Sequence, residues 1–390
     1  MKILQVFDLF SLPHGGGTVS LLNKLLQALV QRGHEVTLYT SDFELDRDYI
    51  NSLPEVKIYP FHCMSSAGGF YFTPDMIGEV RNRLRDFDVV HIHTFRSFQN
   101  IVIHHYARKH GIPYIIDSHG SLPRVHGGKI SYKWLLKWLF DISFGYRILK
   151  DAGRVIAETE VGVNEYKKLN VSQDKIVEIA PPLDIGEFSQ LPPRGLFRRN
   201  YNIDEKHIIM FLGRIHWIKG LDFLVESFYE LAKSRSDVIL VLVGTDDGYK
   251  ATLDRLIDRL NLADKVLFTG FLGGEEKLSA LVDASVVIQT SVYEQGVRVP
   301  FEAILCNAPV IVTRHTGPGE IIGKTDTGYL VEYGNNNELR DMIQYIISNP
   351  AEVQSKTRKA KEYIKANLSL EKGAEKYEEL YRYVTRRNVS

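Results

Sequence analysis

The sequence predicts an α/β protein with two domains, each a parallel sheet covered by helices. The first observation is length, since a chain of 390 residues exceeds one ordinary hydrophobic core. The second is the alternation of short apolar runs with helical patterns in both halves of the chain. The third is that these runs are continuous in Val, Ile and Leu, as in strands that are buried on both faces.

The apolar runs of the first half are short and well separated. The expected strands are Ile3–Phe7, Glu35–Thr40, Val89–Ile92, Tyr114–Asp117 and Val155–Ala157. The expected helices include Val19–Gln31 and Met76–Arg85, in which apolar residues recur with helical spacing. Prolines then interrupt the pattern at Pro181-Pro182 and in Leu191–Gly195, and we interpret this stretch as the domain linker.

The same alternation restarts after the linker. The expected strands are Ile208–Leu212, Val238–Val243, Val266–Thr269, Val286–Thr290 and Val310–Thr313. The expected helices include Leu221–Lys233 and Tyr249–Leu260. Residues 1–185 and 186–369 are therefore predicted to form the two domains. A last helix within 370–390 has one apolar face, which we expect to pack back on the first domain, with the second domain as the alternative.

The composition excludes several classes of protein. A formal net charge of zero gives no general attraction to nucleic acid. Two cysteines far apart, Cys63 and Cys306, form neither a disulfide framework nor a zinc pattern, which fits a reducing compartment. The apolar run after Met1 is too short for a signal peptide, and no stretch has the length of a membrane span. These observations predict a cytoplasmic location.

Ligands of such folds bind where the strands end, so two facing domains are expected to hold a ligand in the cleft between them. Gly15, Gly16 and Gly17 precede the expected helix Val19–Gln31. Glycines let backbone N–H groups approach an anion, and a helix N-terminus favours negative charge. The alternative is a plain turn. The spacing is not that of a dinucleotide fingerprint, so Asp42 is only a weak candidate for the ribose acid of a dehydrogenase.

A basic pair follows the strand that opens the second half. Gly213 and Arg214 come directly after Ile208–Leu212, and Lys219 follows five residues after Arg214. Arginine offers a two-pronged contact to phosphate and lysine offers a point charge. The alternative is a solvated surface pair, but the position at a strand end favours a diphosphate site.

Two carboxylates follow the strand Val286–Thr290. Glu294 lies in the expected loop, and Glu302 follows Pro300, a residue that suits the start of a helix. Glu302 alone could simply stabilise the helix dipole, and Glu294 could be an ordinary loop acid. Carboxylates also bind sugar hydroxyls. Together with the basic pair, they indicate a site for a nucleotide-diphosphate sugar.

At this point the chain resembles a known family over essentially its whole length. It is similar to retaining glycosyltransferases of family 4, which implies the GT-B fold: two Rossmann-like domains facing across a cleft. The paired Gly-Arg…Lys-Gly and Glu-x7-Glu motifs are the specific part of this resemblance. Supporting segments are the glycine-rich loop and Gln31–Val36, Asp88–His93, Ile116–Gly120, Ala152–Glu160 and Gly328–Val331.

The resemblance implies roles for the donor-binding residues. Lys219 and Arg214 would hold the donor diphosphate, which Gly15–Gly17 would also approach. Glu302 would bond the nucleotide ribose, and Glu294 would contact the transferred sugar. The family is commonly metal-independent, so we expect no metal and no cofactor, with the two cations stabilising the leaving diphosphate.

The resemblance also implies how the sugar is transferred. His119 would lie beside the sugar, contributed by the first domain. Retention by double displacement needs a nucleophile under the anomeric carbon, and Glu294 is the nearest candidate by motif. A front-face route is favoured, in which the acceptor attacks from the leaving-group side and the donor phosphate takes its proton.

The loop between the two acids departs from the family pattern. Val297 replaces the usual glycine, Gly296 stands one place early, and Arg298 is unusual. These residues remain candidates for donor contact, and the transferred sugar is expected to be atypical. Arg298 would face an acidic sugar or an acceptor phosphate, or would be a surface residue.

The segment 129–150 is basic and aromatic, with Trp134 and Trp138 among its lysines. Such a helix suits peripheral contact with the inner face of an anionic membrane. The alternative is a helix that packs on the core while its lysines reach solvent. A glycan or lipid-linked acceptor is consistent with the first reading. His91 and His93 share one side of a strand without forming a convincing metal cluster.

The sequence thus predicts a retaining transferase that moves a sugar from a UDP- or GDP-sugar to a glycan or lipid-linked acceptor. Two alternatives stay open: a sugar-nucleotide epimerase of the same fold, and a non-catalytic protein that binds nucleotide sugars. The presence of Arg214, Lys219, Glu294 and Glu302 disfavours the non-catalytic alternative.

Overall fold

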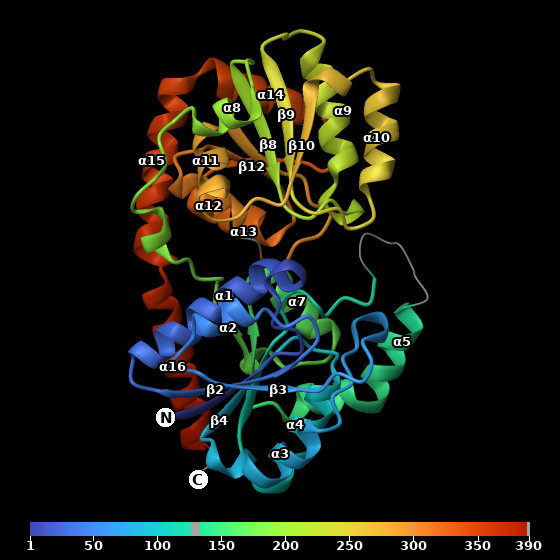
Figure 1. Ribbon diagram of the computed structural model, residues 1–390, viewed down its shortest axis with the longest axis vertical. Coiled ribbons are helices and arrows are strands. Elements are labelled where there is room, and N and C mark those ends of the chain that lie inside the picture. The colour runs from blue at the N-terminus through green and yellow to red at the C-terminus, as the bar shows by residue number, and fades with distance from the viewer. Residues whose placement is uncertain (126–132, 297, 388–390) are drawn as a thin grey trace. The chain divides into compact units, whose positions relative to one another are not determined.

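The computed structural model describes residues 1–125, 133–296 and 298–387, without the side chains of 12–15, 48 and 387. The chain divides into two compact units (Figure 1). Unit 1 is Met1–Pro182 with Leu370–Ser390, and unit 2 is Leu183–Ser369. The sequence analysis had placed this boundary at 185/186.

Unit 1 contains a seven-stranded sheet in the order β3-β2-β1-β4-β5-β6-β7, and all its pairings are parallel. Its strands are β1 (Lys2–Val6), β2 (Glu35–Ser41), β3 (Lys57–Phe61), β4 (Val89–His93), β5 (Tyr114–Asp117), β6 (Arg154–Ala157) and β7 (Ile176–Glu178). The two edge strands, β3 and β7, were not predicted. Lys57–Phe61 contains a proline and β7 has three residues, so neither gives a strong apolar run.

Helices cover both faces of this sheet. The α-helices of unit 1 are α1 (Leu12–Gln31), α2 (Arg47–Asn51), α3 (Met76–Arg83), α4 (Phe98–His110), α5 (Lys133–Phe140), α6 (Tyr146–Asp151), α7 (Glu160–Lys168) and α16 (Leu370–Arg387). The shorter elements are the 3-10 helices η1 (Ala67–Gly69), η2 (Leu84–Asp86) and η4 (Gln173–Lys175), and the π-helix η3 (Asp141–Gly145). One core cluster joins the sheet to α1 and α16, and another joins it to α3, α4, α6 and α7.

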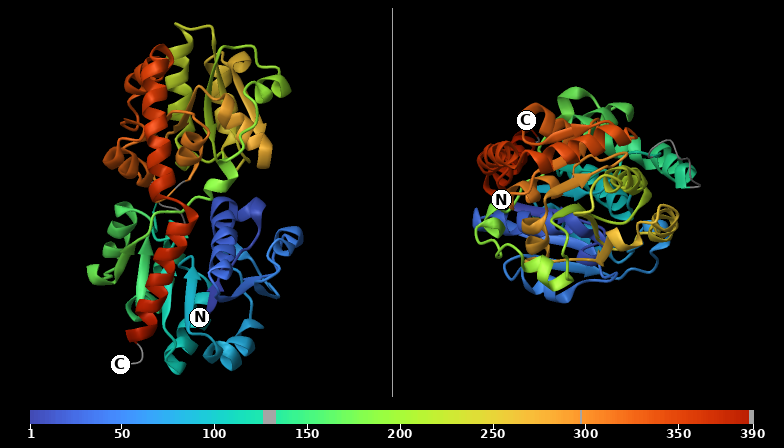
Figure 2. Two further views of the ribbon diagram at one scale, coloured as in Figure 1. Left: turned by 90° about the vertical axis from the view of Figure 1, so that its left-hand side faces the viewer. Right: turned by 90° about the horizontal axis from the view of Figure 1, so that it is seen from above.

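Helix α16 brings the end of the chain to the sheet of unit 1. Its apolar face is buried at Ala374, Tyr377, Leu380, Tyr381 and Val384, in one cluster with α1 (Figure 2). A glycine in unit 1 allows the helix to pack closely, since a Cβ on Gly153 would lie only 3.3 Å from the side chain of Val384. Unit 1 therefore consists of two separate stretches of sequence.

The glycine-rich segment lies differently from the prediction. The expected helix began at Val19, with Gly15–Gly17 in a turn before it. In the structure α1 begins at Leu12 and its path breaks at Gly16, where φ is 50° and ψ is −126°. That positive φ favours glycine, so the segment is a kink within the first turns of the helix.

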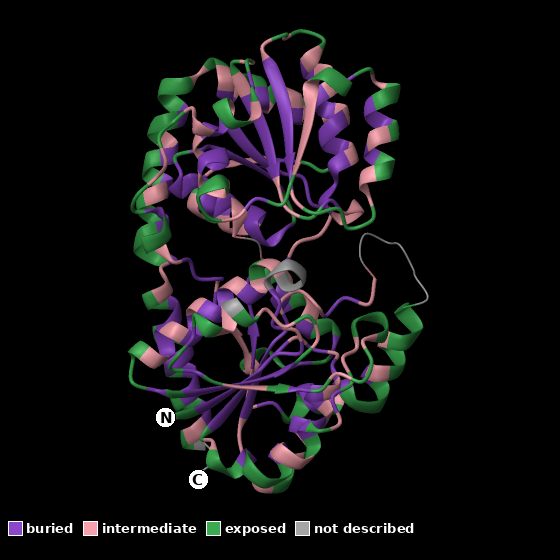
Figure 3. Cartoon of the chain, viewed as in Figure 1, coloured by how far each residue is buried: buried purple, intermediate pink, exposed green. Residues whose placement is uncertain are grey.

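Unit 2 contains a six-stranded parallel sheet in the order β10-β9-β8-β11-β12-β13. Its strands are β8 (His207–Leu212), β9 (Val238–Val243), β10 (Val266–Gly270), β11 (Val286–Gln289), β12 (Val310–Thr313) and β13 (Tyr329–Val331). The sheet interiors of both units are buried (Figure 3). The short strand β13 was not predicted.

The helices of unit 2 lie on both faces of its sheet. They are α8 (Leu196–Tyr201), α9 (Leu221–Ala232), α10 (Lys250–Arg259), α11 (Gly274–Asp283), α12 (Val299–Leu305), α13 (Gly317–Thr325), α14 (Asn336–Ser348) and α15 (Pro350–Asn367), with the 3-10 helices η5 (Ile185–Phe188), η6 (Trp217–Lys219) and η7 (Ala263–Lys265). Helices α9, α10 and α14 share the core cluster of one face, while α12 packs against β11 and β12.

Candidate functional site

Lys219 and Glu294 meet at the carboxyl edge of the unit 2 sheet. Lys219 ends η6, just after β8, and only 9% of its surface is exposed. Its ammonium donates to the carboxylate of Glu294 from the loop after β11, and Ser291 Oγ lies 3.4 Å from the same carboxylate oxygen. The nearly buried lysine thus contacts an acid that comes from a different loop.

Close backbone packing holds these two loops together. Gly220 has φ 61°, and a Cβ there would lie 2.2 Å from the carbonyl oxygen of Thr290. Val292 N–H donates to Ile218 O at 2.8 Å, and the Thr290 hydroxyl donates to Lys219 O at 3.0 Å. The glycine after Lys219 therefore lets the two loops touch.

Arg214 lies further from the core than Lys219. Its guanidinium pairs with Asp247, and the two side chains are 59% and 44% exposed. The loops after β8 and β9 are joined by an Ile215 N–H bond to Thr245 O of 2.8 Å. Sequence reasoning missed Asp247, although an acid just beyond the neighbouring strand end was the signal that could have revealed it.

The backbone between these loops is unusually close. A Cβ on Gly244, which has φ 146°, would lie 1.9 Å from Gly213 O. Gly213 N–H in turn donates to Val243 O at 2.9 Å. Gly213 was predicted to allow close approach of a ligand. In the structure the close neighbour of its carbonyl oxygen is the backbone of Gly244.

Glu302 lies in α12 and is 5% exposed. Lys277 of α11 donates to its Oε2 at 3.2 Å. Burial alone would raise the pKa of Glu302, but the charges of Lys277 and Arg298 hold it below its ordinary value. Lys277 was not predicted, because nothing in the local sequence distinguishes it from other helix lysines. Its contact with Glu302 is apparent only once β10 and β11, which flank α11, are placed in one sheet.

The segment between the two acids is only partly described. Gly296 is half-buried, Arg298 immediately precedes α12, and Val297 lies outside the described residues. The carbonyl of Glu294 accepts from Gly317 N–H at 2.8 Å, which ties this loop to the start of α13. The predicted donor contacts of Gly296 and Arg298 stay predictions.

In unit 1, His119 lies at the carboxyl edge of the sheet, just after β5, with φ 42°. Its Nδ1 is 3.0 Å from Glu158 Oε1 and 3.4 Å from Asp117 Oδ1. Its Nε2 is 2.9 Å from His93 Nδ1, and the two rings are stacked. The side chain is 7% exposed, so each ring nitrogen has a defined partner.

A chain of buried hydrogen bonds continues from His93 to α16. His93 Nε2 lies 2.7 Å from Gln5 Oε1, and Gln5 Nε2 donates to the Tyr381 hydroxyl at 3.1 Å. That hydroxyl lies 2.8 Å from His91 Nδ1. With Gln5 in this orientation and Glu158 as an acceptor, every donor finds an acceptor only if His119 carries both ring protons. Turning the Gln5 amide over reverses the donors from His119 Nε2 to His91 Nδ1 and makes His119 neutral.

The charges of this cluster follow from burial and proximity. Burial lowers the pKa values of His91 and His93 well below the ordinary range and raises that of Asp117 to about 6. Burial also opposes protonation of His119, but Asp117 and Glu158 raise its pKa overall. Among the described residues, Asp117, His119 and Glu158 bring their ligand atoms within 4.8 Å, close enough for one metal ion. A proton shared by the histidine and the two acids accounts for the same spacing.

Asp8 is a further buried acid at this edge that the sequence analysis did not single out. It follows β1, is 8% exposed, and burial raises its pKa to about 7. A lone Asp after a strand gives no signal, because its contact with Thr94 depends on the pairing of β1 with β4. Unit 1 thus provides His119 and Asp8, whereas Arg214, Lys219 and both glutamates belong to unit 2.

Two family models match the chain. The model of Glycosyltransferase Family 4 matches residues 15–187, and that of Glycosyl transferases group 1 matches residues 194–366. Together they span most of both units.

Individual relatives give the same result. The chain is 25% identical, over 96% of each protein, to N-acetyl-alpha-D-glucosaminyl L-malate synthase of Bacillus anthracis. It is 26% identical, over 86% of each protein, to an uncharacterized glycosyltransferase of Methanocaldococcus jannaschii. Among solved structures, Anabaena Alr3699/HepE in complex with UDP-glucose has a TM-score of 0.78 at 18% identity, covering 98% of this chain and all of that one.

Proposed function

Because the chain belongs to glycosyltransferase family 4 and has the GT-B fold, we propose that it transfers a sugar, with retention, from a nucleotide-diphosphate sugar. The observation that carries this proposal is the partly buried Lys219–Glu294 pair at the strand ends of unit 2. A cation and an acid in contact there suit the two parts of one ligand, the diphosphate and the sugar hydroxyls. Relatives solved with UDP and UDP-glucose favour a uridine donor.

In the proposed donor complex, Lys219 and Arg214 face the diphosphate. Each now contacts a carboxylate, so the anionic donor competes with Glu294 and Asp247 for these cations. The two side chains stabilise the charge that develops on the leaving group, which replaces a divalent ion. Metal independence is part of the proposal.

Glu302 is proposed to bind the ribose of the donor. Its carboxylate is buried and its pKa is held low, so it accepts hydrogen bonds as an anion at neutral pH. The salt bridge to Lys277 fixes its orientation. Lys277 is thereby a positioning residue of the proposed ribose contact.

The proposed transfer follows a front-face route. The acceptor oxygen attacks from the side of the departing diphosphate, whose phosphate oxygen takes the acceptor proton. Glu294 orients the sugar and stabilises positive charge at its anomeric carbon, and His119 contributes a hydrogen bond to the sugar. The acceptor is proposed to be a glycan or a lipid-linked glycan, with peripheral membrane contact through 129–150.

The test is a thermal shift of the purified protein with UDP, GDP, ADP and TDP. A ligand at 100 times its dissociation constant stabilises the folded state by about 2.7 kcal/mol. We expect a shift with one nucleoside diphosphate that Lys219→Ala strongly reduces and the exposed control Lys359→Ala keeps.

Incubation with the matching nucleotide sugar then separates the reactions. A new glycoside with unchanged anomeric configuration supports the proposal, and an isomerised nucleotide sugar shows an epimerase. Binding without any turnover, in the presence of candidate acceptors, indicates a non-catalytic protein.

A further inference from the structure

An unusually apolar surface is formed by α5 and η3. None of the residues of α5 is buried, although most of them are Trp, Leu or Phe. Trp134 and Trp138 stack with ring centroids 6.4 Å apart. The exposed large side chains, each between 36% and 60% exposed, are Trp134, Leu135, Leu136, Trp138, Leu139, Ile142 and Phe144. Such a continuous apolar patch marks an interaction site.

This apolar surface is held rigidly on unit 1. Asp141, at the start of η3, is fully buried and accepts from Arg96 at 2.8 Å and from Arg124 at 2.6 Å. Gly145 at the end of η3 is packed so closely that a Cβ would lie 3.0 Å from Phe95 and from Asp141. These contacts fix both ends of η3 to unit 1, while the apolar side chains of α5 and η3 remain exposed to solvent.

The π-helix η3 explains why the apolar side chains point outward. A π turn contains an extra residue, which rotates the helix before it relative to the helix after it. After the turn, α6 buries Ile148 and Leu149 completely in the core. Before the turn, no side chain of α5 is fully buried.

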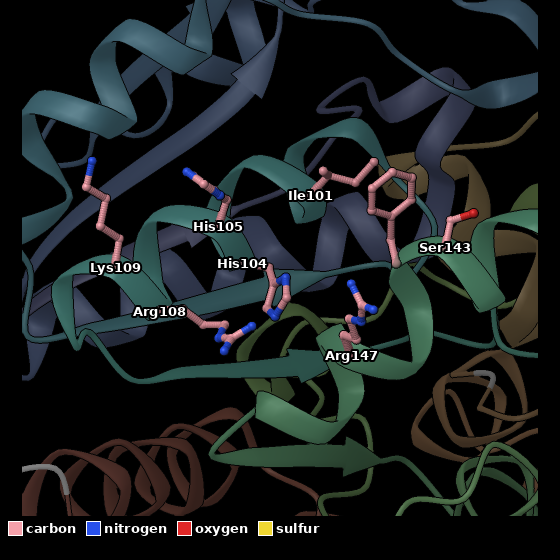
Figure 4. Close-up of a pocket in the computed structure, with 8 residues that line it drawn as sticks. Ile101, His104, His105, Arg108, Lys109, Ser143 and Arg147 are labelled. Carbon is pink, nitrogen blue, oxygen red and sulfur yellow. The ribbon is translucent and has the colours of Figure 1, made fainter.

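A basic hollow adjoins this surface (Figure 4). It has a volume of about 470 Å³ between α4 and the η3–α6 segment, and the exposed Phe144 forms part of its wall. Its lining residues are Ile101, His104, His105, Arg108, Lys109, Ser143, Phe144 and Arg147. In Figure 4 the side chains of Arg108 and Arg147 extend into the hollow on either side of His104.

The charge of the region differs from that of the whole chain. Residues 98–110 and 133–151 contain six lysines and arginines and two aspartates, whereas the whole chain has no net charge. Both acids are already paired, Asp141 with Arg96 and Arg124, and Asp151 with His104 and Arg108. The surface is therefore both apolar and cationic.

We propose that this surface docks on an anionic lipid bilayer, with the α5–η3 side chains in the interface and a lipid headgroup phosphate in the basic hollow. The chemistry fits, because Trp and Leu settle at the headgroup boundary while arginines bind phosphate oxygens. Every helix among the described residues is too short or too polar to span a bilayer. The inference rests on the peripheral contact of the proposed function and names its residues and its lipid chemistry.

The test is flotation of the full-length protein with vesicles of phosphatidylcholine, alone or with phosphatidylglycerol. Wild type should float with the anionic vesicles and much less with the neutral ones. Trp134→Ser with Trp138→Ser should abolish flotation. Each basic residue near an anionic surface strengthens binding about fivefold, so Arg108→Gln with Arg147→Gln should weaken it about 25-fold.

A matched control removes two other exposed charges, Arg358 and Lys359 of α15, as Arg358→Gln with Lys359→Gln. This control should float like wild type, and circular dichroism should show that all variants are folded. Equal flotation of all variants, or none by wild type, would overturn the proposal. So would a tryptophan-dependent dimer that ignores vesicles, which would make the surface a self-association site.

Two further measurements separate the possible failures. If soluble glycerol phosphate raises the melting temperature of wild type but not of Arg108→Gln with Arg147→Gln, and vesicles do not bind, the hollow takes a free phosphate and the lipid assignment is wrong. The shift with nucleoside diphosphates reports on the proposed donor site and not on the α5–η3 surface. Failure of vesicle binding with an intact nucleotide shift therefore rejects the docking surface and leaves the proposed transferase intact.

Discussion

At the scale of single residues, the best-defined feature of unit 2 is a lysine that is nearly buried beside an acid. Removing one partner of such a pair leaves the other partly desolvated and uncompensated. Lys219 and Glu294 therefore depend on each other even before any donor is considered. The same holds for Glu302 and Lys277, which lie on neighbouring helices.

We expect Lys219→Ala to weaken nucleoside diphosphate binding by about 1.5–3 kcal/mol, the usual worth of a hydrogen bond to a charged group. Isothermal titration calorimetry measures this loss. Glu294→Gln should reduce turnover more than binding, because it keeps the shape of the side chain and removes its charge. Full turnover of Glu294→Gln would show that Glu294 does not act on the sugar.

Burial opposes protonation of His119, but Asp117 and Glu158 together raise the pKa of its imidazole. A histidine whose pKa is raised on folding adds stability that is complete below its unfolded pKa, about 6.5, and is lost as pH rises through the folded value. Glu158→Gln removes one acid that raises this pKa. The stability advantage of wild type over the variant should therefore be largest below about pH 6.5 and should shrink as pH rises through the raised pKa of His119.

Urea unfolding at a series of pH values measures the effect, with Glu178→Gln, an exposed acid of β7, as the control. A difference between wild type and Glu158→Gln that does not change with pH would mean that Glu158 packs against His119 without stabilising its charge.

At the scale of elements, the chain of hydrogen bonds from His119 to α16 links parts of the sequence that are far apart. Tyr381 stands 376 residues from Gln5, which donates to its hydroxyl. No local pattern of the sequence could predict the contact between Gln5 and Tyr381. The apolar face of α16, in contrast, was evident from the spacing of its apolar residues. The same contrast holds for the sheets: continuous apolar runs predicted the central strands, and the edge strands β3, β7 and β13 escaped because they are short or mixed.

The polar partners of the candidate site were hidden from the sequence for the same reason. The strand-end positions of Arg214, Lys219 and Glu294 follow from local motifs and from the rule for parallel sheets. Asp247 and Lys277 became visible only once β9, β8, β11 and β10 had a defined order. Local spacing thus identified the residues, and the strand order identified what they contact.

Tyr381→Phe tests the buried chain. The change removes one hydroxyl that accepts from Gln5 and lies 2.8 Å from His91, and it keeps the ring in place. Leaving buried polar groups unpaired costs about 1–3 kcal/mol, so the free energy of unfolding should fall by that amount. Tyr363→Phe, on the exposed face of α15, is the control and should be neutral. A neutral Tyr381→Phe would show that the hydroxyl adds nothing to stability.

At the scale of the whole molecule, the chain leaves unit 1 at Pro182 and returns to it at Leu370. Unit 1 therefore cannot complete its core until all of unit 2 has been made. Helix α16 fills that core with Tyr377, Tyr381 and Val384, and its loss would expose an apolar face of the sheet and of α1. Unit 2 closes its own sheet within one continuous stretch.

A variant that ends at Ser369 should separate the two units thermodynamically. Unit 1 loses several fully buried side chains, each worth about 2–5 kcal/mol when truncated, which together approach the stability of an ordinary domain. Calorimetry should show that the unfolding transition of unit 1 disappears or falls steeply in temperature. The transition of unit 2 should remain and should still rise with the nucleoside diphosphate that wild type binds, since Lys219 and Glu302 lie within it. If nucleotide binding were lost as well, the binding residues of unit 2 would depend on unit 1, and the donor site could not be assigned to unit 2 alone.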